Sequence, residues 1–169
     1  MVAAVREGKM EADALAGALP RVLPIASAMG VSFNEVGASF AAMSRNGTDA
    51  SEAATQLRGI LGSLLTPTKE AEDTMNSLGL SSSGLRQQIK DKGLLSTLQT
   101  LTTAFGDNEQ AQGLVFGNVR ALTGIMSMFG EATASTTKIF ENLADNTGDA
   151  DKAFQAMSQT GAFKMKQVM

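Results

Sequence analysis

The sequence predicts an all-α protein of about eight to nine short helices, packed as a bundle or hairpin array with no sheet. Three observations predict this class. Apolar residues recur at helical spacing, glycine and proline divide the chain into short segments, and residues typical of β-sheets are scarce, since the chain has no Trp and no Tyr. With 43% hydrophobic and 18% charged residues, the chain is too apolar for a disordered protein and too polar for a membrane-embedded one.

The N-terminal segment predicts a helix over 2–19, in which small residues surround charged ones and few residues are suited to a core. Pro20 and Pro24 break or redirect it, because proline lacks a backbone N–H. A short apolar element over 22–29 then ends at Gly30, a residue that readily adopts the left-handed conformation of a helix C-cap.

Two capped helices are predicted next. Ser32 and Glu35 have the spacing of a capping box, and Gly47 closes the helix that they start. Asp49 and Glu52 repeat the arrangement ahead of a second helix. The predicted buried faces are Phe33, Val36, Phe40 and Met43 in the first helix, and Ala53, Leu57, Ile60, Leu61, Leu64 and Leu65 in the second.

The middle of the chain predicts several shorter helices. Thr66 can cap a helix that has Pro67 at its first position, where the missing N–H costs nothing, and Gly79 ends that helix. A polar loop over 81–84 follows, and Asp107-Asn108 is predicted to cap the helix after it. The helices expected between these signals are 67–78, 85–90 and 94–105.

A helix-packing seam is predicted over 109–129, where apolar residues follow in steps of four and three. Gly113 and Gly117 have the spacing that lets two helices approach closely, and Gly124 lies on the same segment. Interior glycine also weakens a helix, so the pattern leaves open a break at Gly117. The seam residues are Val115, Val119, Leu122, Met126 and Phe129.

The last part predicts two helices, 131–144 and 149–169, divided by the turn 145–148. The pattern continues to the last residue, so we expect a fragment or a truncated reading frame. The expected organisation is an N-terminal helix over 1–19 that ends a preceding helical region, a core helical region over 20–130, and two further helices over 131–169.

The composition argues against most chemistry. The chain has no Cys and no His, which leaves no zinc finger, thiol nucleophile or imidazole base. Its net charge of −3 and scattered basic residues predict no sequence-specific nucleic-acid binding, and no apolar stretch is long enough for a transmembrane segment. We therefore expect no cofactor and no metal.

Carboxylates are the remaining candidates for catalysis. Glu70, Glu72 and Asp73 could supply a general acid for glycan cleavage, but acidic residues at a helix start also complement its dipole, and we favour that structural role. The acidic segment 145–151 is similar to a calcium loop, yet the twelfth position is Ala156 instead of glutamate. The sequence predicts that the chain is not an enzyme.

A set of short motifs over 19–129 resembles the core region of the phage tail tape measure proteins, in the phage minor tail protein family. The motifs are 18–24, 30–33, Gly47, 53–58, 65–68, 78–80 and 116–124, and their order and spacing carry the resemblance. The family-motif positions, each of which also suits a helix boundary or a core stripe, are Gly30, Ser32, Gly47, Thr55, Leu57, Arg58, Pro67, Thr68, Gly79, Phe116, Gly117, Val119, Arg120 and Gly124.

The resemblance implies a structural role in tail-length determination and tail tube assembly, inside the tube lumen of the virion and in the host cytoplasm during assembly. The implied partners are other copies of the chain, the tail tube protein and tail assembly chaperones. Two alternatives stay open: a secreted or pore-forming helical protein that acts on a membrane, and, less favoured, a cell-wall hydrolase.

Overall fold

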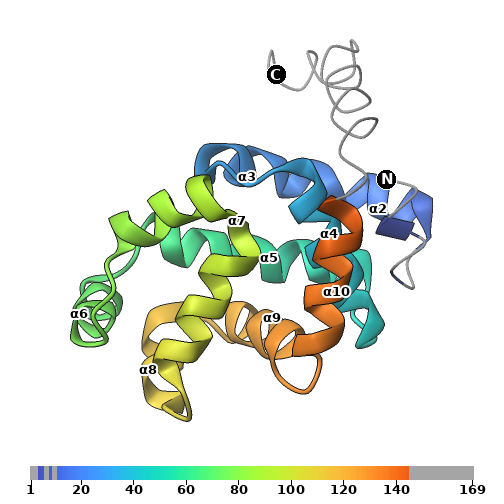
Figure 1. The fold of residues 1–169 in the computed structure, drawn as a ribbon. Helices are drawn as coiled ribbons and strands as arrows, with labels where there is room; N and C mark the ends of the chain where they lie inside the picture. The colour runs from blue at the N-terminus through green and yellow to red at the C-terminus, as the bar shows by residue number, and fades with distance from the viewer. Residues whose placement is uncertain (1–3, 6–7, 9–10, 145–169) are drawn as a thin grey trace.

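The computed structural model describes residues 4–5, 8 and 11–144, and this part contains helices and no strand. Figure 1 shows α5 at the centre of the molecule with the other helices around it. The predicted all-α class is confirmed. The helices are α2 (Ala12–Ala18), the 3-10 helix η1 (Leu19–Arg21), α3 (Leu23–Met29), α4 (Phe33–Arg45), α5 (Ala50–Leu65), α6 (Lys69–Ser77), α7 (Ser82–Phe105), α8 (Glu109–Phe116), α9 (Val119–Phe129) and α10 (Thr133–Ala144).

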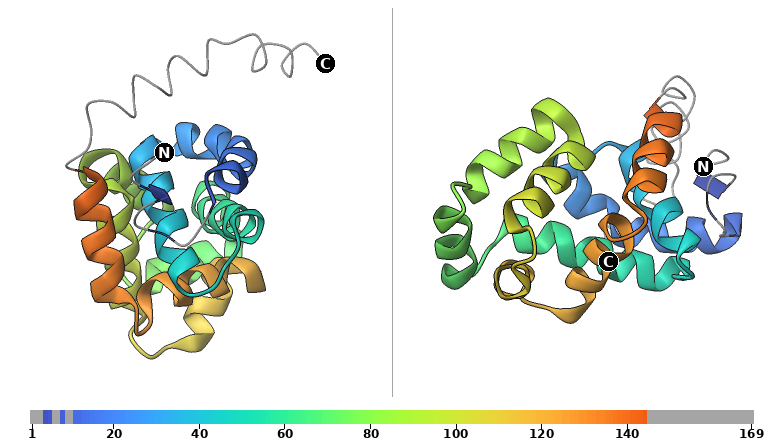
Figure 2. Two further views of the ribbon diagram at one scale, coloured as in Figure 1. Left: turned by 90° about the vertical axis from the view of Figure 1, so that its right-hand side faces the viewer. Right: turned by 60° about the horizontal axis from the view of Figure 1, so that its bottom comes forward.

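The hydrophobic core is built around α5, which contacts α2, α3, α4, α7, α8 and α9. Its predicted stripe is confirmed, because Leu57, Ile60, Leu61 and Leu64 are fully buried, while Leu65 at its end is half-buried. A helix surrounded on so many sides must be apolar around most of its circumference. The two further views in Figure 2 show the same arrangement from the side and from below.

The caps predicted for the first helices are present. Gly30 ends α3 with φ 78°, in the left-handed region. Ser32 and Glu35 form the full capping box at the start of α4, and Asp49 accepts a hydrogen bond from the backbone N–H of Glu52 at the start of α5. Of the predicted face of α4, Val36, Phe40 and Met43 are fully buried and Phe33 is half-buried.

Three predicted helix boundaries are wrong. The helix over 2–19 is interrupted at Glu11, whose backbone is extended and precedes α2. The cap of α6 is Thr68, whose hydroxyl accepts the N–H of Ala71, so this helix starts two residues after the predicted Pro67. Ser82 to Gly84 lie in the first turn of α7, because Ser81 caps that helix.

The predicted division of α7 is confirmed in its physical sense. The backbone of Gly93 is non-helical, with φ 86° and ψ 170°, and it separates the two predicted segments within one kinked helix. Only glycine adopts this conformation without strain.

The predicted seam over 109–129 is wrong. Gly117 ends α8 with φ 55°, and Asn118 starts α9, so a spacing counted across both residues has no meaning. On α9 the buried residues are Ala121, Gly124, Ile125 and Met128. Of the predicted seam, Val115 is buried in α8, Leu122 and Phe129 are half-buried, and Val119 and Met126 are exposed.

The helix α10 lies along α4 and closes one side of the core with Ile139, Phe140 and Leu143 (Figure 1). It begins at Thr133, two residues after the predicted start. The predicted helix 149–169 and the calcium-like segment 145–151 lie outside the described residues.

Candidate functional site

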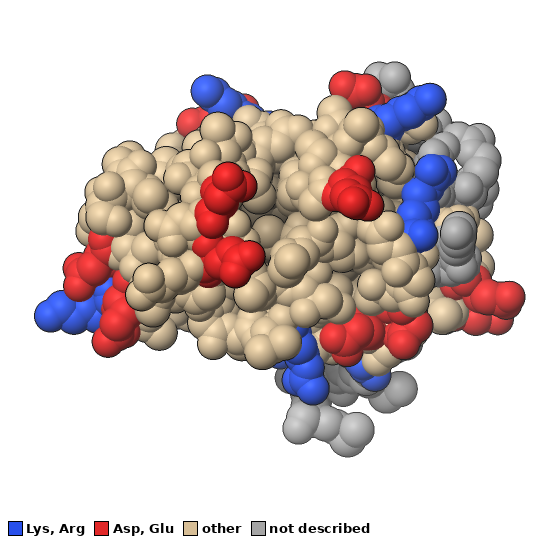
Figure 3. Space-filling view, turned by 90° about the horizontal axis from the view of Figure 1, so that it is seen from below, with Lys and Arg blue, Asp and Glu red and all other residues tan. Residues whose placement is uncertain are grey.

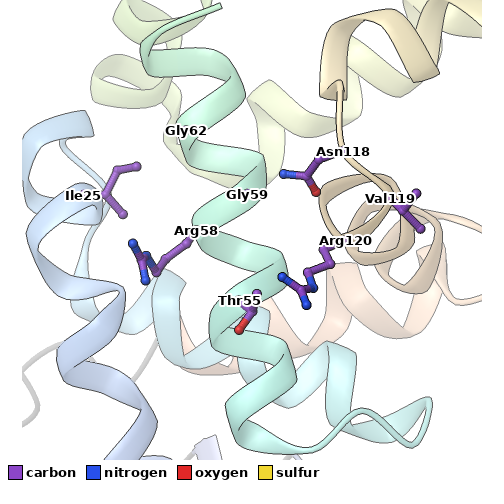
Figure 4. Close-up of a pocket in the computed structure, with 8 residues that line it drawn as sticks. All are labelled: Ile25, Thr55, Arg58, Gly59, Gly62, Asn118, Val119 and Arg120. Carbon is purple, nitrogen blue, oxygen red and sulfur yellow. The ribbon is translucent and has the colours of Figure 1, made fainter.

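The family motifs from two distant parts of the sequence meet in one surface groove between α3, α5 and the start of α9. The groove has a volume of about 650 Å³. Figure 4 shows Thr55 and Arg58 on α5, Val119 and Arg120 on α9, and Ile25 on α3. Gly59, Gly62 and Asn118 complete the lining. We call this surface the basic groove.

Small residues at the contact of α5 with α9 bring the two motifs together. A side chain at Gly59 would place its Cβ 3.1 Å from the Cβ of Ala121. At Gly124 a Cβ would lie 3.0 Å from the Cβ of Gln56 and 3.1 Å from Cδ1 of Ile60. These distances are tighter than ordinary van der Waals contact, so the helices approach closely because both lack bulk there. Gly113, in contrast, is exposed and a Cβ there would meet no atom within 4 Å, so the close packing predicted for it is wrong.

The turn between α8 and α9 sets which way the motif side chains face. Gly117 is left-handed, and the Asn118 side chain accepts a hydrogen bond from the N–H of Ala121 at 2.8 Å. This cap starts α9 so that its small residues face α5. Val119 and Arg120, in the first turn, are left on the surface, and Val119 is 80% exposed.

The basic groove has two arginines with no charged partner among the described residues. Arg58 and Arg120 are both exposed, and neither guanidinium hydrogen-bonds or ion-pairs with another residue in the described part of the chain. In Figure 4, Arg58 points towards α3, and Arg120 points back towards Thr55 on α5. With an apolar floor and two free guanidinium groups, the groove suits the acidic and apolar surface of another protein.

A second groove runs along the other side of α9. It has a volume of about 500 Å³, and it is lined by Leu122, Met126 and Phe129 of α9 and by the turn from α7 to α8. Asp107 and Glu109 lie at that turn and are exposed. We call this surface the acidic groove.

The remaining family-motif positions shape the fold. Gly30, Gly47, Gly79 and Gly117 have positive φ angles and end or follow helices, while Ser32 and Thr68 are N-caps, and Pro67 lies in the link that precedes α6. Leu57, Phe116 and Gly124 are buried. The Phe116 ring packs edge-on against Phe105, with ring centroids 5.9 Å apart. The importance of these positions to the family stays a prediction.

The candidate carboxylates do not form a catalytic pair in the structure. Glu70 and Asp73 are exposed on α6, and Glu72 accepts a hydrogen bond from the Ser82 hydroxyl at 3.2 Å. The described residues contain no cluster of three or more acidic side chains that could hold a metal ion. Within 4–5, 8 and 11–144, no helix is both long and apolar enough to cross a bilayer.

Sequence reasoning missed two members of the basic groove in their structural roles. Ile25 belongs to α3 and has no signal in the motifs that would place it near α5. Asn118 was detectable, because glycine followed by asparagine is typical of one helix ending and another beginning.

Comparisons with known proteins agree with the motifs. Residues 1–117 match the family described as phage-related minor tail protein. The chain is 29% identical to the tape measure protein of Pneumococcus phage Dp-1, over 98% of this chain and 14% of that protein. It is 26% identical to the probable tape measure protein of Escherichia phage P2, over 85% of this chain and 20% of that protein.

The chain therefore spans only a seventh to a fifth of the length of these relatives. No solved structure matches it significantly. Since the family match covers well over half of the chain, this protein belongs to the phage-related minor tail protein family.

Proposed function

We propose that this chain is a folded helical module of a phage tail tape measure protein, and that it serves tail assembly as a scaffold and performs no reaction. The family match and the two tape measure relatives support this role. The proposed partners are other copies, the tail tube protein and tail assembly chaperones. The proposed locations are the tube lumen of the virion and, during assembly, the host cytoplasm.

The observation that carries the proposal is that the chain folds back on itself instead of forming a long helix. Six glycines with positive φ angles, at positions 30, 47, 79, 93, 106 and 117, interrupt the described helices. As one unbroken helix, Ala12–Ala144 would span roughly 200 Å at about 1.5 Å per residue. A compact body of this size has a radius of gyration of about 15 Å. This segment therefore contributes far less length than its residue number would suggest.

Tail length measured by electron microscopy tests the proposal. An in-frame deletion of 12–144 from a complete tape measure gene should shorten the tail by much less than about 1.5 Å per residue. The matched control replaces the same residues by an unbroken helical sequence of equal length, which should lengthen the tail. Shortening in full proportion to the deleted residues would contradict the folded module. The division at residues 19 and 130 stays a prediction, because this experiment removes all three parts together.

The two alternative functions have separate tests. Leakage of a dye from liposomes on addition of the purified chain would favour a pore-forming protein over a tail scaffold. Loss of turbidity from purified cell walls, abolished by Glu70→Gln, would favour a hydrolase. We expect neither, because the described helices have no membrane-spanning length and Glu70 is fully in solvent contact on α6.

A further inference from the structure

The outer side of α9 is an apolar ridge without a neighbour in the described part of the chain. Val119 is 80% exposed and Met126 is 62% exposed. The two residues are seven positions apart, so they lie on the same side of the helix about 10 Å from each other. Large side chains at this exposure gain stability only when a further surface covers them. We call this pair the α9 ridge.

The grooves on the two flanks of the ridge have opposite charges. Arg120 follows Val119 by one position and faces the basic groove, whereas Leu122 follows by three and faces the acidic groove. The side chains of Asp107 and Glu109 in the acidic groove, like Arg58 and Arg120, have no hydrogen-bond or ion-pair partner among the described residues. Figure 3 shows the molecule from the side of α8 and α9, where acidic side chains border a hollowed, uncharged surface and basic ones lie nearer its edges.

We propose that the α9 ridge and its two grooves bind a second copy of this chain. A partner of a single charge would be attracted by one groove and repelled by the other. A second copy supplies both charges at the same spacing, so the surface is complementary to itself. A two-fold axis that runs roughly along α9 exchanges the flanks, places each basic groove over an acidic groove, and leaves the two α9 helices parallel.

The two components of this surface have different tasks. Burial of Val119 and Met126 supplies affinity, because apolar area leaves water. The four charged side chains at the rim set the orientation and speed the encounter, and their contribution falls as salt rises.

Sedimentation equilibrium of the purified full chain tests the proposal. We expect a dimer that dissociates on dilution, and more readily at high salt. The double variants R58E/R120E and D107K/E109K should each be monomeric, because each places like charges over one another. A mixture of the two should dimerise again, since every reversed groove then faces an opposite charge. Circular dichroism confirms that both variants are folded, and Val119→Ser with Met126→Ser tests the ridge without any change of charge.

The parallel arrangement has its own test, made simple by the absence of cysteine in the chain. Under mild oxidation, Val119→Cys and Met126→Cys should each form disulfide-linked dimers with themselves. The control Ser77→Cys, on the exposed surface of α6, should form few. An antiparallel pair would instead link the two variants to each other.

Three results would overturn the proposal. The wild-type chain could stay monomeric up to about 1 mM, where even a weak specific contact is populated. The dimer could be insensitive to both charge-reversed variants, which would place the contact elsewhere. The mixture could also fail to associate although each variant is folded. These measurements use the chain alone, so they stand whether or not the proposed role in a tail is correct.

Discussion

The carboxylate of Glu35 accepts a hydrogen bond from the backbone N–H of Leu94, 59 residues further along the chain. Its other oxygen accepts the N–H and the hydroxyl of Ser32, each at 2.9 Å. One side chain thus completes the cap of α4 and also caps the second half of α7, which starts again after Gly93. A local capping motif has become a long-range connection.

Removal of this carboxylate should destabilise two helices at once. We expect Glu35→Ala to lower the free energy of unfolding by about 2 kcal/mol, because two sets of backbone donors lose their acceptor. Glu35→Gln keeps one oxygen and should lose less. Urea unfolding followed by circular dichroism measures both. A loss for Glu35→Ala no larger than that of Ser32→Ala would show that the contact with Leu94 contributes nothing.

Two helical glycines should respond in opposite directions to alanine. Gly124→Ala should destabilise the protein by about 1–2 kcal/mol, because the new methyl group meets Gln56, Ile60 and Met43 at 3.0–3.3 Å. Gly113→Ala has open space and should stabilise the protein by about 0.5–1 kcal/mol through helix propensity. Thermal unfolding compares them. Equal shifts in Tm would mean that α9 does not pack closely on α5.

The start of α6 can be located by a pair of threonine substitutions. Thr68→Ala should cost about 1 kcal/mol, since its hydroxyl caps the N–H of Ala71. Thr66→Ala should change stability by less than about 0.5 kcal/mol, because its hydroxyl only bonds back to the carbonyl of Gly62 at 3.3 Å. The same urea titration serves both. The reverse order of costs would restore Thr66 as the cap.

Arg86 should matter more for stability than the groove arginines. Its guanidinium donates to the last carbonyls of α5, those of Leu64 and Leu65, each at 3.2 Å. We expect Arg86→Met to cost about 1–2 kcal/mol in chemical denaturation. Arg58→Met, on an exposed side chain without a partner in the described residues, should cost less than about 0.5 kcal/mol. Equal losses would refute the capping role of Arg86.

The sequence predicted the fold class and most helix caps because both depend on local chemistry. The box of Ser32 with Glu35, the left-handed Gly30 and the stripe of α5 need only neighbours a few residues away. The start of α6 was misplaced because Thr66 and Thr68 are equally good caps in isolation. The backbone of the link through Pro67 decides between them.

The candidate site could be predicted only in part. The motifs over 53–58 and 116–124 pointed to the right residues, but nothing local shows that they share a groove. On α9 the apolar spacing favoured Val119 and Met126 as the buried side. The structure buries Ala121 and Gly124 instead, because close approach to α5 needs small side chains more than large ones. Which face is buried was decided by the partner helix, to which a single-helix pattern is blind.

The central place of α5 also determines when the chain can finish folding during synthesis. Ile60 and Gln56 are covered by α9, so their side of α5 has no cover until the ribosome has released residues beyond Phe129. A chain cut at residue 117, where the family match ends, would keep α5 but expose this apolar side to water. The limit of recognisable kinship is therefore not a limit at which the polypeptide can be divided, and truncated products that stop there should aggregate.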